Sequence, residues 1–72
     1  MDKTVHPATA QILRYFEYAH LPEHLQGISR RCSDVAIVMA RELDGPELTA
    51  GLRKLLEAKD CFVRAALPKP EE

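Results

Sequence analysis

The chain is poor in tryptophan, glycine and cysteine. Its 72 residues include no tryptophan, three glycines and two cysteines. Two cysteines exclude a disulfide-rich scaffold. The longest uninterrupted apolar run, residues 35–40, is far too short to cross a bilayer as a helix. No apolar run follows Lys3, so we expect no secretory signal, no membrane association and a reducing cytosol.

The sequence also lacks an excess of either charge. Its 10 basic and 11 acidic residues give a net charge of −1. Proteins that bind polymeric nucleic acid along its phosphate backbone carry a basic excess, so we expect no DNA or RNA partner. The balance does not exclude a small phosphorylated ligand, because one or two arginines suffice to neutralise it.

No catalytic pattern can be assembled from the residues. The chain has no glycine-rich phosphate loop and no serine–histidine–acid or paired-carboxylate arrangement at a suggestive spacing. His20 and His24 have the spacing of a helical zinc site, but Pro22 between them breaks that geometry. We therefore expect no enzyme activity, no metal and no cofactor.

The pattern of apolar residues and prolines predicts an all-α fold in one domain, residues 1–72. A short helix is expected over 8–19, with Pro7 in its first turn. Two longer helices follow, over 22–43 and 46–66, separated by Asp44-Gly45-Pro46. The two long helices are expected to form an antiparallel hairpin. Residues 1–6 and 68–72 are expected to be flexible.

Each predicted helix has one apolar face. In the second helix this face comprises Leu25, Ile28, Cys32, Val35, Ala36, Met39 and Leu43, and in the third Leu48, Leu52, Leu55, Leu56, Phe62, Val63 and Ala66. Further apolar or small residues lie off these faces: Ile37, Val38, Ala58, Cys61 and Ala65. Because a 72-residue core is marginal alone, these residues predict contacts in a homo-oligomer.

Five other residues of the helices carry specific expectations. Cys32 lies on the core face and Cys61 points away, so no intrachain disulfide is expected. Gly27 and Gly51 indicate close packing of helices. Lys59 interrupts the apolar face of the third helix, and we expect its ammonium to reach solvent or a carboxylate at the edge of the hairpin.

The aromatic residues are concentrated in one short segment. Three of the four fall within four positions, Tyr15, Phe16 and Tyr18, and the Arg30-Arg31 pair follows beyond the proline. Phe16 continues the apolar stripe of the first helix, whereas Tyr15 and Tyr18 lie off it. Rings and guanidinium groups together suit a ligand that contains bases and phosphates, although arginines on a helix are also common as solvated charge. The candidate ligand-binding residues are Tyr15, Tyr18, Arg30 and Arg31.

Two ungapped segments resemble the small phage proteins of the Acb2 family. They are YFEYAHLPEHLQ at 15–26, with Ser29-Arg30 after it, and LRKLLEAKD at 52–60. This family shares its helical-hairpin domain with the Tad1 anti-Thoeris proteins. The resemblance implies an anti-CBASS sponge in the cytoplasm of an infected bacterium, which binds cyclic oligonucleotide signals without cleaving them. It also implies a homohexamer with pockets between subunits for cyclic dinucleotides such as cGAMP, and separate pockets for cyclic trinucleotides.

The resemblance assigns roles to two residues. Tyr15 matches the family's base-stacking tyrosine, and Arg30 occupies the place of a lysine that contacts the ligand phosphate. The segment 31–34 departs from the family's proline-containing continuation, which bears on the trinucleotide pocket. Two alternatives stay open: a sponge for the cyclic ADP-ribose signals of Thoeris, and an oligomeric hairpin that binds a host protein through Ile37, Val38 and Arg41.

Overall fold

The computed structural model describes residues 6–67, and within this range all regular secondary structure is helical, with no strand. The helices are α1 (Pro7–Arg14), α2 (Glu23–Glu42) and α3 (Pro46–Ala66). The expected all-α class is therefore confirmed. Residues 1–5 and 68–72, which were expected to be flexible, lie outside the described range.

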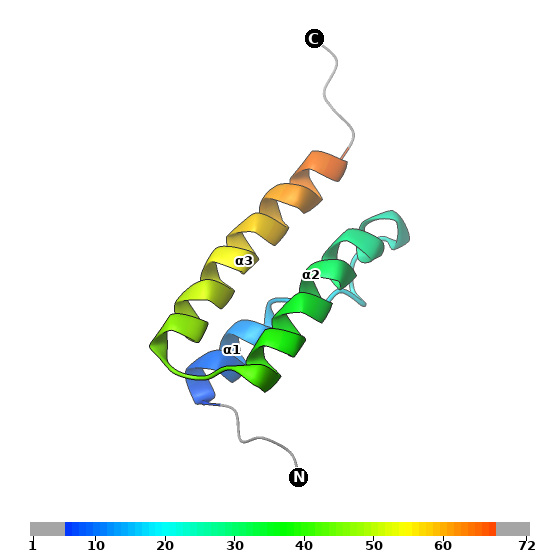
Figure 1. Cartoon of the computed structure of the whole chain (residues 1–72). Helices are drawn as coiled ribbons and strands as arrows, with labels where there is room; N and C mark the ends of the chain where they lie inside the picture. The colour runs from blue at the N-terminus through cyan, green and yellow to red at the C-terminus, as the bar shows by residue number, and fades with distance from the viewer. Residues whose placement is uncertain (1–5, 68–72) are drawn as a thin grey trace.

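The two long helices lie side by side and run in opposite directions (Figure 1). Residues 43–45 connect them, and α1 packs near this connected end, against α3 and α2. Gly45 has a φ of 92°, a left-handed conformation that glycine adopts without the steric cost of a side chain. This glycine allows the chain to reverse between Glu42 and Pro46.

The first helix begins as the sequence predicts. Pro7 occupies the first turn, where its missing N–H costs nothing. His6 belongs to the segment expected to be flexible, but it caps the helix: its Nδ1 accepts a hydrogen bond of 3.1 Å from the backbone N–H of Ala8. Satisfying this exposed N–H helps so short a helix to form.

The predicted end of the first helix is wrong. The helix ends at Arg14 instead of Ala19, and residues 15–22 form a turn-rich connection to α2. The backbone N–H of Leu21 donates to the carbonyl of Tyr18 at 3.0 Å. The side-chain amide of Gln26 on α2 then donates to the carbonyl of Leu21 at 2.9 Å. These bonds give the backbone of the connection an alternative to continuing the helix.

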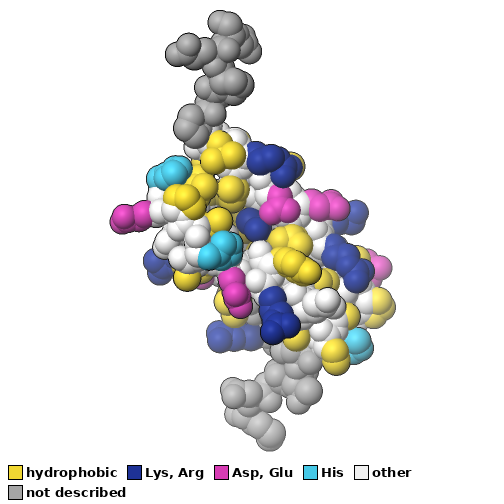
Figure 2. All heavy atoms as spheres, turned by 180° about the vertical axis from the view of Figure 1, so that it is seen from behind, with side chains coloured by type: hydrophobic (Ala, Val, Ile, Leu, Met, Phe, Trp, Pro, Cys, Tyr) yellow, Lys and Arg dark blue, Asp and Glu magenta, His cyan; other side chains and the backbone are white. Residues whose placement is uncertain are grey.

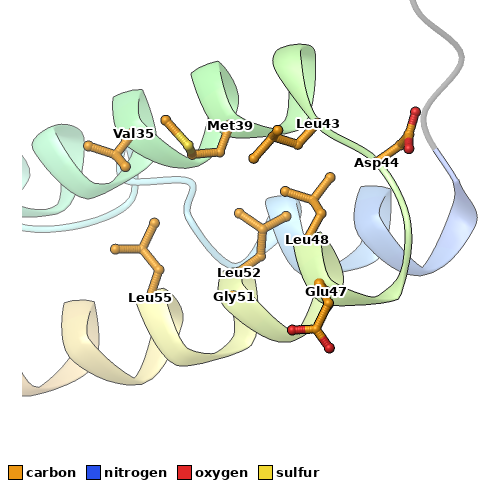
Figure 3. Close-up of a pocket in the computed structure, with 9 residues that line it drawn as sticks. All are labelled: Val35, Met39, Leu43, Asp44, Glu47, Leu48, Gly51, Leu52 and Leu55. Carbon is orange, nitrogen blue, oxygen red and sulfur yellow. The ribbon is translucent and has the colours of Figure 1, made fainter.

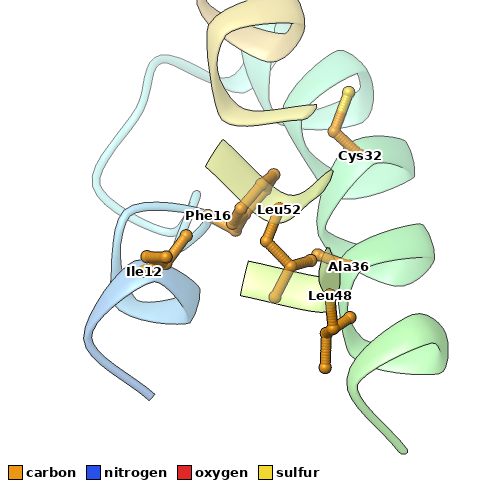
Figure 4. Close-up of a cluster of buried hydrophobic side chains, with 6 residues drawn as sticks. All are labelled: Ile12, Phe16, Cys32, Ala36, Leu48 and Leu52. Atoms are coloured by element: carbon orange, nitrogen blue, oxygen red, sulfur yellow. The ribbon is translucent and has the colours of Figure 1, made fainter. Parts of the chain in front are cut away.

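The core lies where α1 and the connection meet the two long helices. Its buried cluster takes apolar side chains from α1, the connection, α2 and α3: Ile12, Phe16, Cys32, Ala36, Leu48 and Leu52 (Figure 4). Phe16 is only 1% exposed, although it lies just beyond α1. Burying a phenylalanine this fully stabilises the fold by about 1.5–3 kcal/mol by area.

The buried face of α2 is not centred where hydrophobicity placed it. The buried residues of this helix are mostly small: Leu25, Ser29, Cys32, Ser33, Ala36 and Ala40. Val35 and Leu43, which were expected in the core, are 48% and 50% exposed, and Phe62 of α3 is 54% exposed. Small side chains allow neighbouring backbone to approach closely, so the side bearing Ser29 and Ser33 is covered while larger residues stay at the surface.

Cysteines and glycines give mixed outcomes. Cys32 is buried, Cys61 is exposed, and both are free thiols, as predicted. The expectation of close packing at Gly27 and Gly51 is wrong within one chain. Both are exposed, and apart from its chain neighbours and its own helix backbone, no described atom would lie within 4 Å of a Cβ at either position.

Candidate functional site

Tyr15 combines an exposed side chain with a fixed backbone. It follows the last residue of α1, and its residue surface is 59% exposed. Its N–H donates to the carbonyl of Ile12 at 3.0 Å. Its own carbonyl accepts a hydrogen bond of 3.1 Å from Nζ of Lys59 on α3. The next residue, Phe16, is buried in the core. An aromatic ring is thus presented to solvent from a segment that is anchored on both sides.

Lys59 has one partner that the sequence predicted and one that it did not. Its side chain is 11% exposed, and its Nζ lies 3.0 Å from Oδ1 of the neighbouring Asp60. The expected carboxylate partner is therefore confirmed. The second partner, the carbonyl of Tyr15, has no signal in the sequence, because the two residues are 44 positions apart.

Tyr18 lies in the connection between α1 and α2 and is half-buried. Its carbonyl closes the turn with Leu21. Since the first helix ends at Arg14, the angle between the rings of Tyr15 and Tyr18 is not the angle of a continuous helix. The connection sets the orientation of this second ring.

Arg30 and Arg31 are both exposed on α2, but they point in different directions, since consecutive helical residues are rotated by about 100°. Arg31 lines a cavity of about 460 Å³ between α2 and α3, together with Ile28, Cys32, Phe62, Ala65 and Ala66. Arg30, Tyr15 and Tyr18 line neither this cavity nor the two described below. A single chain therefore does not gather the four candidate residues into one of these cavities.

A second hollow, which we call the open groove, runs between α2 and α3 and has a volume of about 440 Å³. Val35, Met39 and Leu43 face Leu48, Leu52 and Leu55 across it, and Asp44 and Glu47 lie at its connected end (Figure 3). The sequence placed these apolar residues in the core of the hairpin. Leu48 and Leu52 do belong to the buried core cluster, and Met39 and Leu55 pack against it. Val35 and Leu43 are instead about half exposed at the groove, and no sequence signal distinguishes these two from core residues.

The third cavity, of about 320 Å³, lies at the connected end of the helix pair and is lined by His6, Ala8, Gly45, Pro46, Thr49 and Arg53. On the face opposite to the view of Figure 1, lysine and arginine side chains are interspersed with aspartate and glutamate, and apolar patches lie between them (Figure 2). That face carries no continuous basic surface.

The sequence predicts no metal site, so the positions of the candidate ligands in the structure are of interest. Residues 6–67 contain no group of three or more His, Cys, Asp and Glu side chains that could hold a metal ion. His20 and His24, which have the zinc spacing, are both exposed. None of α1, α2 and α3 is long and apolar enough to cross a membrane.

Comparison of the chain with protein-family models, curated proteins and solved structures finds no match.

Proposed function

We propose that this protein is a phage anti-defence sponge of the Acb2 type, which sequesters cyclic oligonucleotide signals in the cytoplasm of the infected bacterium and so blocks CBASS immunity. Its ligands are cyclic dinucleotides such as cGAMP, with cyclic trinucleotides as a second class. The protein holds the ligand and releases it intact.

The observation that carries this proposal is the exposed ring of Tyr15 on an anchored backbone. Any nucleobase can stack on such a ring, and each stacked base contributes about 1–3 kcal/mol. Because the backbone of Tyr15 is already held at both its N–H and its carbonyl, less conformational freedom is lost on binding, which favours affinity.

Arg30 supplies the second recognition group. Its guanidinium is exposed on α2 and carries a charge that suits a phosphodiester oxygen. Tyr15 and Arg30 lie on separate elements and share none of the three described cavities within one chain. We propose that the pocket forms between subunits, where the tyrosine of one subunit meets the arginine of another.

The open groove supports self-association of a helical hairpin into a homo-oligomer, with a hexamer expected from the resemblance. The groove exposes the large apolar side chains of Val35 and Leu43, and burying such surface against another copy is favourable. The charged residues that line the groove are both acidic, and a cationic partner that a second copy could offer them is Arg31 of the neighbouring cavity. Asp44 and Glu47 lie at one end of the helix pair, and Arg31 lies in the next cavity toward the other end, so two antiparallel copies pair opposite charges.

A calorimetric panel tests the ligand class. The parent protein is titrated with cyclic dinucleotides, cyclic trinucleotides and cyclic ADP-ribose isomers, and Tyr15→Phe serves as a matched control that retains the ring. We expect binding of a cyclic dinucleotide, its release unchanged on heat denaturation, and loss of affinity in Tyr15→Ala but not in Tyr15→Phe. Binding of cyclic ADP-ribose isomers alone would assign the protein to Thoeris signals. Binding of none would favour the host-protein module.

A further inference from the structure

Lys59 occupies an unusual place for a charged residue. It lies on the face of α3 that carries Leu52 and Val63, and its side chain is only 11% exposed. Desolvation of an ammonium is costly unless polar partners replace water. A lysine at this point therefore requires partners, and their identity indicates what it does.

The two partners differ in kind. Asp60 is the next residue on the same helix, and its side chain is 48% exposed, so this ion pair joins nothing that the helix does not already join. The carbonyl of Tyr15 lies 44 residues away and belongs to the cap of α1. A positive charge at this end also complements the negative end of the α1 dipole. The second contact alone ties α3 to the segment that carries the exposed ring.

We propose that Lys59 is a positioning residue that fixes the direction of the Tyr15 ring. The hydrogen bond holds the peptide plane between Tyr15 and Phe16, while the N–H of the same plane donates to Leu13 at 3.1 Å. Burial of its ring in the core also restrains Phe16, the residue that follows Tyr15. Lys59 touches no ligand in this scheme. Its effect on ligand binding rests on the proposed function of Tyr15, but its effect on the order of Tyr15 does not.

The test compares three variants of the full chain. Lys59→Met removes the charge and the donor but keeps an unbranched side chain suited to an apolar face. Lys59→Arg restores a cationic donor. Lys54→Met makes the same replacement at an exposed lysine of the same helix and is the matched control. Circular dichroism checks that each variant stays helical, and Lys59→Leu, which also removes both charge and donor, replaces Lys59→Met if that variant does not fold.

Two readouts report on Tyr15 without any ligand. The first is the NMR order parameter of the Phe16 amide, which shares its peptide plane with the Tyr15 carbonyl. We expect it to fall in Lys59→Met from the rigid value of about 0.85 toward about 0.6. The second is tyrosine fluorescence anisotropy. The chain has no tryptophan and two tyrosines, so a Tyr18→Phe background makes Tyr15 the only emitter. The anisotropy should fall with Lys59→Met and recover with Lys59→Arg.

The third readout is calorimetric titration with cGAMP. We expect roughly tenfold weaker binding in Lys59→Met, which corresponds to about 1.4 kcal/mol, and parental binding in Lys54→Met. An unchanged order parameter and anisotropy in a folded Lys59→Met would overturn the proposal, and so would unchanged affinity in a parent that binds cGAMP. If the parent binds no cyclic nucleotide, the proposed function fails, and the two spectroscopic readouts still decide whether Lys59 positions Tyr15.

Discussion

The two sides of the α2 and α3 pair are built from different kinds of residue. The side covered by α1 and the connection is lined along α2 by small side chains such as Ser29, Ser33 and Ala36. The opposite side carries the open groove and large apolar residues such as Val35 and Leu43. Hydrophobicity alone therefore does not identify the covered side. Close approach does, because only small residues allow it, while the large apolar residues remain available for a second surface.

The strongest test of this comparison is a matched pair of phenylalanines. Phe16 is buried on the covered side, and Phe62 is more than half exposed and lines the cavity that also contains Arg31. Phe16→Ala should lower the free energy of unfolding by about 3–5 kcal/mol, because it removes the centre of the core. Phe62→Ala should cost about 1 kcal/mol at low protein concentration. Urea denaturation followed by circular dichroism measures both. Equal losses in dilute protein would contradict the assignment of the two sides.

A carboxylate placed in the groove tests whether another copy covers it. Val35→Asp should dissociate the oligomer, since an unpaired charge in an apolar interface costs on the order of several kcal/mol. Ile37→Asp places the same charge on another part of α2, where the residue is also exposed. Light scattering at micromolar concentration gives the mass of each variant. A monomeric parent protein would show that no such interface exists. If only Ile37→Asp dissociated the oligomer, the interface would lie on the face that carries Ile37 and Val38 instead of in the groove.

The third prediction concerns Tyr15 and Arg30, which line neither the open groove nor the other two described cavities. Tyr15→Ala should weaken cyclic dinucleotide binding by roughly ten- to hundredfold, as expected for loss of one stacked base. Arg30→Lys should retain part of the affinity and Arg30→Ala should lose it, because the phosphate contact depends on charge. Calorimetry on folded oligomers measures the order of these effects. Parental binding in both alanine variants would shift attention to Tyr18 and Arg31.

The smallest expected effect is that of replacing each helical glycine by alanine, which tests whether a second copy covers the groove. Gly51 on α3 borders the open groove, whereas Gly27 lies on α2 away from it, and a Cβ at either position would meet open space beyond its own helix within one chain. In an isolated chain each Gly→Ala change should stabilise its helix by about 1 kcal/mol. If another copy packs closely into the groove, thermal denaturation should show this gain for Gly27→Ala and a loss for Gly51→Ala. A gain for both would mean that the backbone at Gly51 stays uncovered.

Local signals predicted the helices well where they were strong. The Asp44-Gly45-Pro46 sequence places the start of α3 at Pro46, and its predicted end at Ala66 is also observed. The end of α1 could not be predicted in this way. Residues 15–19 contain no glycine or proline that would mark the end of the helix. Instead, the carbonyl of Tyr15 finds a partner in Lys59, 44 positions away, and the carbonyl of Leu21 finds one in the nearby Gln26.

The residue types of the candidate site could be proposed from the sequence, but not their arrangement. Off the apolar stripe, Tyr15 was expected at the surface and is exposed, whereas Phe16 was expected in the core and is buried. The contact between Lys59 and the carbonyl of Tyr15 could not be predicted from the sequence, because the two residues are 44 positions apart and no local pattern links them. Whether Tyr15 and Arg30 meet across subunits depends on contacts that one chain does not contain.

The contacts that hold α1 in place join residues far apart in the sequence. Thr9 and Thr49 hydroxyls lie 3.3 Å apart across 40 positions, and Lys59 reaches Tyr15 across 44. A helix of eight residues has little stability alone, so α1 forms only as it docks on α3. A ligand that binds Tyr15 only when α1 is docked would therefore also shift the equilibrium of α1 toward its docked, helical state. Filling the site and completing the fold become one linked equilibrium, in which each makes the other more favourable.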